Sequence, residues 1–282
     1  MDDVIWSGTD FPYMCLIDQH RTQTFKKAIE NTVKAGDLVI DVGSGTGIMA
    51  FFAATAGAGK VYAVEVDHLM AETLRKSIKL NNLEEVIEVV EANALDAQLP
   101  QNADVVIAEL IETGLLDEMQ VQVMNELRNK GVITSKTKVV PSAYETFVRL
   151  LNVQNEFYGY KIAAPIHDWP FYLLNNEEWH QLHKQYVSEP ISLGKFDFQL
   201  QAIDPHVDKK LEFTLDAGQQ VNALEISGMS RLTDDIELGA ANSYNGNKIL
   251  TFDPITGPKQ IKIHFDYQMS QGLGSFNFSV ES

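Results

Sequence analysis

The hydrophobic positions in the first half of the chain alternate between short apolar segments and longer segments with helical spacing. Short apolar runs have the length of buried strands, and hydrophobic residues that recur every three or four positions predict amphipathic helices. The expected strands are residues 38–42, 60–65, 86–91 and 104–108, and the expected helices are residues 22–33, 48–58 and 69–80. Because sequential strands joined by helices form parallel sheets, this half predicts a doubly wound α/β domain.

A different pattern follows Pro141, where turn residues separate short segments of alternating hydrophobic and polar residues. These segments cover residues 196–200, 210–215, 248–252, 261–265 and 276–280. Alternating strands joined by turns predict an antiparallel β-sandwich or barrel. We therefore expect two domains, an α/β domain at residues 1–143 and an all-β, barrel-like domain at residues 144–282.

Acidic residues clearly outnumber basic ones in the chain. There are 39 Asp and Glu against 22 Lys and Arg, which gives a formal net charge of −17 at pH 7. A nucleic-acid partner is therefore not expected, because phosphate contacts need a basic face. The acidic surface would attract a cationic partner, or it would serve solubility alone, and composition by itself favours solubility.

The chain has a single cysteine, Cys15, which cannot form an internal disulfide. The first residues lack the basic flank and apolar stretch of a signal peptide, and no apolar run reaches the length of a membrane span. A lone cysteine also fits a reducing compartment. We expect a cytoplasmic protein with no membrane partner.

The strongest local motif is a glycine turn between an expected strand and an expected helix. Its glycines stand at alternate positions, where they permit backbone angles that side chains forbid and let a ligand lie against the main chain. Glu65 follows eighteen residues after Gly47, at the end of the next strand, where a carboxylate can accept both hydroxyls of a ribose. The spacing is G-x-G-x-G, not the G-x-G-x-x-G that holds a pyrophosphate. Because S-adenosyl-L-methionine (SAM) has no phosphate, we expect SAM in preference to NAD.

The expected SAM-binding residues from this motif are Asp41, Gly43, Ser44, Gly45, Thr46, Gly47 and Glu65. Asn93 lies just past the third expected strand, where it could meet the edge of the adenine ring. It could equally be a turn residue, and both interpretations stay open.

Two glutamates follow the fourth expected strand at a spacing of nine residues, Glu109 and Glu118. Ligands of open α/β sheets bind beyond the carboxyl ends of the strands, so Glu109 is expected in the cleft, and a turn at Gly114 could bring Glu118 back beside it. The alternative is that Glu118 only begins a helix. Glu112 is a rival second carboxylate, which we expect to be a solvated loop residue.

The glycine turn, Glu65 and the spacing from Glu109 to Glu118 resemble the protein arginine methyltransferases, including the double-glutamate hairpin of that family. Residues 108–118 look more like its symmetric and monomethylating branches than its commonest members, whose hairpin carries Trp-Met-Gly after the first glutamate. Residues 14–21 resemble the segment ahead of the family's first helix. Its Asp-x-x-Arg supplies an arginine for the SAM carboxylate, which here is Arg21.

Further on, residues 131–133 and 140–142 are similar to the strand and the proline that precede the family's β-barrel. The resemblance covers residues 10–145, and beyond them it extends to the architecture alone. It implies an α/β Rossmann-like class I methyltransferase domain followed by an all-β barrel-like domain, with SAM as the cofactor. It also implies methyl transfer to an arginine nitrogen, with Glu109 and Glu118 as catalytic residues.

The chemistry of a guanidinium explains the pair of glutamates independently. This group is planar and always protonated, with a pKa of roughly 13.8. Two carboxylates can hold it through charge-assisted, bidentate hydrogen bonds and align one nitrogen with the methyl group. They also stabilise the charge that shifts toward the acceptor during transfer.

The chain departs from the family at three places. Residues 241–247, the nearest counterpart of the family's Thr-His-Trp loop, contain neither His nor Trp. Cys15 stands where relatives place Met or Phe, and no insertion resembles a helical dimerisation arm. The acceptor, a cationic protein or a small molecule, and a homodimer are therefore left open. Two alternatives also remain, a small-molecule amine methyltransferase on the same scaffold and a catalytically silent SAM-binding interaction module.

No metal site is expected. Only His180 and His183 form a close pair that helical spacing would bring to one face, and Glu177 and Glu178 beside them equally indicate a solvated helix. A zinc site needs three or four ligands, and no third ligand is evident.

Overall fold

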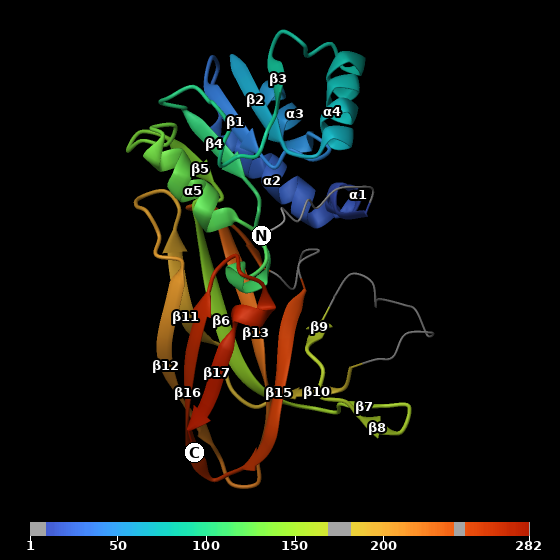
Figure 1. Cartoon of the computed structure of the whole chain (residues 1–282), viewed down its shortest axis with the longest axis vertical. Helices are drawn as coiled ribbons and strands as arrows, with labels where there is room; N and C mark the ends of the chain where they lie inside the picture. The colour runs from blue at the N-terminus through green and yellow to red at the C-terminus, as the bar shows by residue number, and fades with distance from the viewer. Residues whose placement is uncertain (1–9, 169–181, 240–245, 282) are drawn as a thin grey trace.

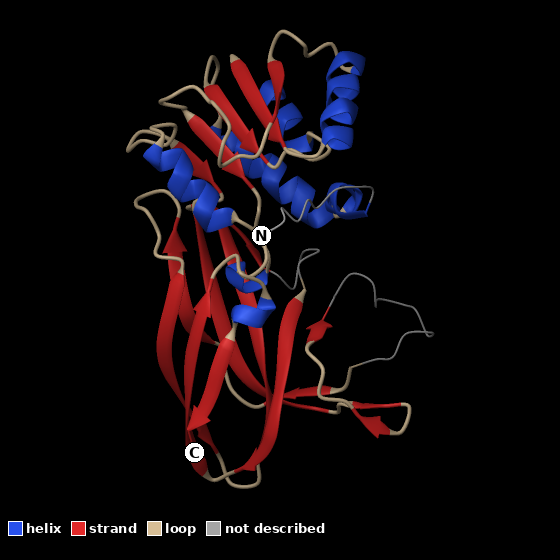
Figure 2. Ribbon diagram, viewed as in Figure 1, coloured by secondary structure: helices blue, strands red, loops and turns tan. Residues whose placement is uncertain are grey.

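The structure is a computed structural model that describes residues 10–168, 182–239 and 246–281. Figure 1 shows an N-terminal unit of helices around a sheet, drawn above a longer unit of strands. Figure 2 shows that helices concentrate in the first unit and that strands dominate the second. The predicted order, an α/β domain followed by an all-β domain, is confirmed. The exact boundary expected at residue 143 stays a prediction.

Five parallel strands form the sheet of the first unit, in the spatial order β3-β2-β1-β4-β5. They are β1 (Leu38–Val42), β2 (Lys60–Glu65), β3 (Ile87–Glu91), β4 (Val105–Ala108) and β5 (Lys138–Val140). β1 is central and almost wholly buried, as expected of a parallel strand covered on both faces. Parallel strands end at one edge of the sheet, so the residues that follow β1, β2 and β4 meet there.

Helices surround this sheet, and local sequence explains where two of them begin. They are α1 (Asp10–Ile17), α2 (Gln19–Thr32), α3 (Ile48–Thr55), α4 (His68–Leu80) and α5 (Gln120–Asn129). Asp18 caps α2 by accepting a hydrogen bond from the Arg21 amide, and Asp67 caps α4 in the same way. The predictions of α2, α3 and α4 are confirmed, whereas α1 and α5 were not predicted as helices.

The second unit consists of antiparallel strands. Its larger sheet contains β6 (Ala143–Val153), β9 (Ile166–Asp168), β10 (Lys184–Tyr186), β11 (Ile191–Asp197), β13 (Gln220–Thr233), β14 (Ile236–Gly239) and β15 (Asn247–Thr256). A second sheet pairs β12 (His206–Leu215), β16 (Lys259–Gln268) and β17 (Asn277–Glu281), and β7 (Glu156–Phe157) with β8 (Tyr160–Lys161) forms a separate hairpin. Two short 3₁₀ helices, η1 (Thr113–Leu115) and η3 (Leu273–Ser275), lie in loops.

The two longest strands of the larger sheet, β6 and β13, were not predicted. Gly228 in β13 has a packing reason, because a Cβ there would overlap the hydroxyl of Tyr144 on β6. The Tyr144 side chain can lie against the backbone of β13 at this point only because residue 228 has no side chain.

The two units share one hydrophobic core. A single buried cluster contains Val106 of β4 and Leu127 of α5 together with Leu224 of β13 and Phe265 of β16. Continuous burial across the units fixes their relative placement, so elements of the second unit can contribute directly to a site on the first. None of the described helices is both long and apolar enough to cross a bilayer.

Candidate active site

The glycine turn joins β1 to α3, and both its backbone angles and its close packing require glycine. Gly43, Gly45 and Gly47 all have positive φ, at 70°, 51° and 83°. A Cβ at Gly43 would overlap the side chain of Leu110, and a Cβ at Gly47 would overlap that of Leu74. The turn therefore follows a backbone path that only glycine adopts without strain at these three positions, where the main chain carries no side chain.

Glu65, at the end of β2, holds this turn in place. Its side chain is buried, and its two oxygens accept hydrogen bonds from the Gly45 amide at 2.7 Å and from the Asp67 amide at 2.9 Å. The structure thus brings Glu65 to the glycine turn, as the sequence predicts. Its contact with a ribose stays a prediction.

Asp41 lies at the start of the turn and is almost completely buried. Burial raises the pKa of its carboxyl group to about 7, and the charge of Glu65 adds to the shift. The Ser44 hydroxyl donates to the carbonyl oxygen of Asp41 at 3.0 Å, which tightens the turn. Thr46 lies half-buried on the same turn.

Asn93 follows β3, two residues beyond the position that pairs with Glu65. Its side-chain oxygen accepts a hydrogen bond from the Leu95 amide at 3.0 Å, which is an Asx turn. The turn interpretation is therefore supported. A contact with adenine stays a prediction.

Arg21 links α2 to the glutamate hairpin. It reaches from α2 to form an ion pair with Glu109, and it also donates to the carbonyl oxygen of Cys15 at 3.3 Å. Its guanidinium lies 5.4 Å from the centre of the Phe25 ring. Burial is the largest single effect and lowers the pKa of Arg21, but Glu109, Cys15 and Asp18 together outweigh it and raise that pKa above its ordinary value.

Glu118 lies in the electrostatic field of the same residues. Burial raises the pKa of its carboxyl group to about 8, the charge of Glu109 adds to this shift, and Arg21 opposes it. Burial also raises the pKa of the Cys15 thiol to about 11, with further effects from Arg21 and both glutamates. Cys15, Arg21, Glu109 and Glu118 therefore occupy one neighbourhood.

The hairpin between the two glutamates turns at Gly114, which has φ of 83°. Its last glutamate comes before α5, because that helix begins at Gln120 with Met119 as its N-cap residue. The N-cap makes no side-chain hydrogen bond. Glu118 therefore lies directly before the N-cap of α5, and its alternative role, as a carboxylate at the start of a helix, stays open.

Glu112 corrects a prediction. We expected a solvated loop residue, but its exposed fraction is only 9% and it forms an ion pair with Lys248 of β15. Lys248 also contacts Asp117, with the ammonium nitrogen 2.7 Å from a carboxylate oxygen. The expectation was wrong because a loop is solvated only where no other element covers it, and here the second unit covers the hairpin.

Lys248 itself was missed by the sequence analysis. Burial alone lowers the pKa of its side chain to about 7, whereas contact with two carboxylates favours the charged ammonium. We conclude from these contacts that the ammonium form is stabilised. No strong signal was available, because Lys248 is the first residue of the expected strand 248–252 and follows a polar segment.

Gln120 was also missed. It is fully buried, and its side-chain oxygen accepts a hydrogen bond from the Leu110 amide at 3.0 Å, next to Glu109. Within the described part of the chain its side-chain nitrogen has no partner. Gln120 thus orients the peptide that follows Glu109.

Comparisons with known proteins support one interpretation of this geometry. The family model of the ribosomal protein L11 methyltransferase (PrmA) matches residues 19–158. The chain is 28% identical over 269 residues to an uncharacterized protein of Methanocaldococcus jannaschii, covering 95% of each chain. It is also 28% identical to an arginine N(omega)-methyltransferase of Streptomyces achromogenes over 229 residues, 76% of this chain and 62% of that protein.

Among solved structures, the chain is similar to the Trypanosoma brucei PRMT1 enzyme-prozyme heterotetrameric complex with AdoHcy. The TM-score is 0.75 at 19% identity, over 95% of this chain and 96% of that one. This chain has the protein arginine methyltransferase-like fold. The family match and the sequence relatives further indicate a SAM-dependent methyltransferase. The chain spans less than two thirds of the length of the named arginine methyltransferase, so the acceptor is a matter for proposal.

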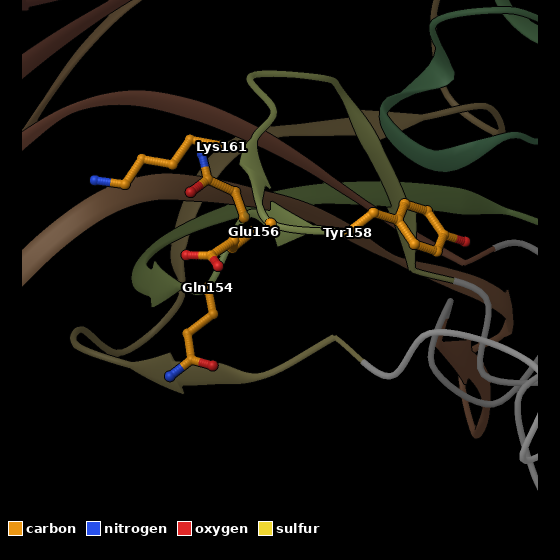
Figure 3. A pocket seen from close by; sticks show the side chains of 6 residues that line it. Gln154, Glu156, Tyr158 and Lys161 are labelled. Carbon is orange, nitrogen blue, oxygen red and sulfur yellow. The ribbon is translucent and has the colours of Figure 1, made fainter.

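Two other features of this methyltransferase fold lie away from the glycine turn. Figure 3 shows a hollow at the β7–β8 hairpin, which projects from the second unit in Figure 1. It is lined by Gln154, Asn155, Glu156, Tyr158, Gly159 and Lys161. Elsewhere among the described residues, ligand atoms of Asp208, His264 and Asp266 lie within 4.8 Å of one another on the exposed side of β12 and β16. Neither feature contacts the glutamate hairpin.

Some predictions fall on residues that the structure does not describe. These are His180, Glu177 and Glu178 of the histidine segment, and most of residues 241–247. Of the latter segment, Gly246 and Asn247 are described, and both are buried beside the hairpin.

Proposed function

We propose that this protein transfers the methyl group of SAM to a guanidinium nitrogen of arginine. The observation that carries the proposal is the gathering of Glu109, Glu118 and Arg21 beyond the carboxyl end of β4. With both glutamates ionised and Arg21 charged, the group has a net negative charge that a cationic acceptor can neutralise. The glutamates then align the acceptor nitrogen for in-line attack.

The glycine turn has the properties that SAM binding needs. One oxygen of the Asp41 carboxyl group is buried and accepts no hydrogen bond from the described residues, and the glycine main chain carries no obstructing side chains. A ligand with N–H and O–H groups fits there. We propose that Asp41, Gly43–Gly47, Glu65, Asn93 and Arg21 hold SAM, which supplies an activated methyl on a sulfonium.

The chain's own residues then account for the reaction. Glu109 and Glu118 hold the guanidinium, whose nitrogen forms the new N–C bond as the bond from carbon to sulfur breaks. S-adenosylhomocysteine leaves, and the methylated guanidinium loses one proton to solvent or to an ionised carboxylate. Arg21 pairs with Glu109, and we propose that it also contributes to binding of the SAM carboxylate.

The test uses labelled SAM and a cell lysate, followed by hydrolysis of the products and separation of methylated amino acids. We expect label in methylated arginine, and none in methylated lysine, because an ammonium is a point charge that cannot fill two carboxylates with a planar fork. Label found only on lysine, oxygen or carbon contradicts the proposal. A weak signal on generic arginine-rich peptides does not, because residues 241–247 differ from the family's loop.

A small-molecule acceptor is the second candidate. It is favoured by the similarity to the arginine N(omega)-methyltransferase of Streptomyces achromogenes, whose name specifies arginine without a protein. Fractionating the labelled lysate by size distinguishes the two, because label on a small molecule passes an ultrafilter and label on a protein does not. Complete absence of turnover would instead favour a silent SAM-binding module.

A further inference from the structure

One buried lysine contacts the loop that joins the two glutamates of the hairpin, and it comes from the other unit of the molecule. Lys248 on β15 is only 5% exposed. Its ammonium contacts Glu112, three residues after Glu109, and Asp117, the residue before Glu118. A buried lysine is rare unless it is paired, and this one is paired with two carboxylates of one loop.

The rest of the hairpin is also attached to the second unit. Hydrogen bonds join the Thr113 hydroxyl to the Gly246 carbonyl at 2.8 Å, the Ser270 amide to Leu115 at 3.0 Å, the Gly272 amide to Leu116 at 2.8 Å, and the Ser270 hydroxyl to the Glu118 carbonyl at 2.6 Å. The second unit therefore holds nearly every residue from Thr113 to Glu118.

Glu109 and Glu118 are thus held by different units of the molecule. Glu109 is fixed within the first unit, by Arg21 on α2 and by the bond from Leu110 to Gln120. Glu118 is fixed by contacts from the second unit. The separation of the two carboxyl groups consequently depends on where the second unit holds the hairpin.

We propose that Lys248 is a positioning residue, which holds the hairpin from β15 so that Glu109 and Glu118 face the same acceptor. The inference rests on the proposed function and names a determinant of acceptor binding within it. Lys248 also neutralises buried negative charge next to Glu118. Without it, Glu112 and Asp117 would repel one another and the hairpin would shift toward solvent.

Two variants separate positioning from stability. Lys248→Met keeps the length of the side chain but leaves the buried carboxylate of Glu112 and the half-buried carboxylate of Asp117 without their shared cation. The triple variant Lys248→Met, Glu112→Gln, Asp117→Asn removes all three charges at similar volume, so it folds without that penalty. Lys262→Met is the matched control, because Lys262 is an exposed lysine on β16 that pairs with the exposed Glu212.

The assay measures initial rates of methyl transfer to a capped arginine peptide, the KM of SAM, and the thermal unfolding midpoint. We expect the triple variant to unfold near the wild-type temperature and to keep the KM of SAM within about twofold. Its kcat/KM for the peptide should fall about 10²-fold, the scale reported for small misplacements of reacting groups. Lys262→Met should match the wild type throughout. Normal peptide kinetics in the triple variant would overturn the proposal.

Hydrogen exchange provides a readout that does not need an acceptor. With S-adenosylhomocysteine bound, amides of residues 113–118 should exchange faster in the triple variant than in the wild type, while β1 to β3 stay unchanged. Unaltered exchange in the hairpin contradicts the positioning role whatever the acceptor is. Failure of the wild type to methylate arginine, with faster hairpin exchange in the variant, counts against the proposed function alone.

Discussion

At the scale of single residues, Glu65 and Glu118 differ in their proposed roles, which are cofactor binding for Glu65 and methyl transfer for Glu118. Glu65 is a buried carboxylate whose two oxygens already accept backbone hydrogen bonds from the glycine turn and from the start of α4. Glu118 is half-buried, and burial raises the pKa of its carboxyl group to about 8. Substitutions at these two positions should therefore affect different measurements.

Glu65→Ala should weaken SAM binding by about 1.5–3 kcal/mol, the scale of a hydrogen bond to a charged group. The variant removes the expected ribose acceptor and also releases the Gly45 amide. Isothermal titration calorimetry with SAM measures the change, and Glu88→Ala, at an exposed glutamate on β3, serves as the control. Affinity that matches the control would remove Glu65 from the binding site.

Glu118→Gln should lower kcat by about 10²-fold or more, the scale of losing one electrostatic stabiliser. The amide keeps the size of the side chain but lacks the charge that holds a guanidinium, so SAM affinity should stay near the wild-type value. Steady-state kinetics together with calorimetry separate the two effects. A normal turnover in this variant would eliminate the two-carboxylate mechanism.

The raised pKa of Glu118 also predicts a pH dependence. Because the acceptor guanidinium stays protonated throughout, wild-type kcat/KM should rise as pH increases through about 8 and Glu118 ionises.

Stability should change in the opposite sense. The unfolded carboxyl group ionises near pH 4.5 and the folded one near 8, so folding takes up a proton and the free energy of unfolding falls across this interval. Glu118→Gln should lack the rise in kcat/KM and should show a smaller fall in stability, because Asp41, whose pKa is raised to about 7, still contributes to that fall. A pH series of rates and unfolding midpoints measures both effects.

At the scale of elements, the glycine turn and the glutamate hairpin are built in different ways. The turn is determined by local backbone geometry, since Gly47 at the start of α3 has φ of 83° and lies against Leu74. The hairpin is determined by contacts with strands far along the chain. The turn should thus respond to the removal of a single glycine.

Gly47→Ala and Gly36→Ala form a matched pair that tests the turn. Both glycines have a similar positive φ, but a Cβ at Gly36 meets nothing within 4 Å, whereas one at Gly47 overlaps Leu74. The backbone strain of each should cost roughly 1–2 kcal/mol of unfolding free energy. Only Gly47→Ala should lose more than this and weaken SAM binding. Equal losses measured by chemical denaturation would show that close packing at Gly47 contributes nothing.

At the scale of the whole molecule, charge is the dominant property, with a net value of −17. A cationic acceptor is drawn to such a surface over a distance set by screening, about 8 Å at physiological ionic strength. We therefore expect kcat/KM for a cationic acceptor to fall as salt rises, with little change in kcat at saturation. A peptide of the same sequence around arginine but zero net charge is the control. Identical salt dependence for both peptides would assign the acidic surface to solubility.

Which helices and strands could be predicted from the sequence depends on whether their pattern is local. Strands β1 to β4 and helices α2 to α4 were predicted because each has its own hydrophobic period and clear breaks at its ends. Helix α1 and strand β13 were not, since α1 is nearly uniform in hydrophobicity and β13 is buried on both sides over much of its length. An alternating pattern exists only where one face of a strand meets solvent.

The sequence by itself determined the parallel sheet, the glycine turn and the place of Glu65 and Glu109 at the ends of strands. These features depend on short-range periodicity and on backbone angles, which neighbouring residues set. Only the tertiary structure decided which charges meet. Arg21 pairs with Glu109 across 88 residues of the sequence, and Lys248 pairs with Glu112 across 136. Such contacts depend on which element covers a loop, and no local pattern records that, so Glu112 could be predicted as solvated although the second unit buries it.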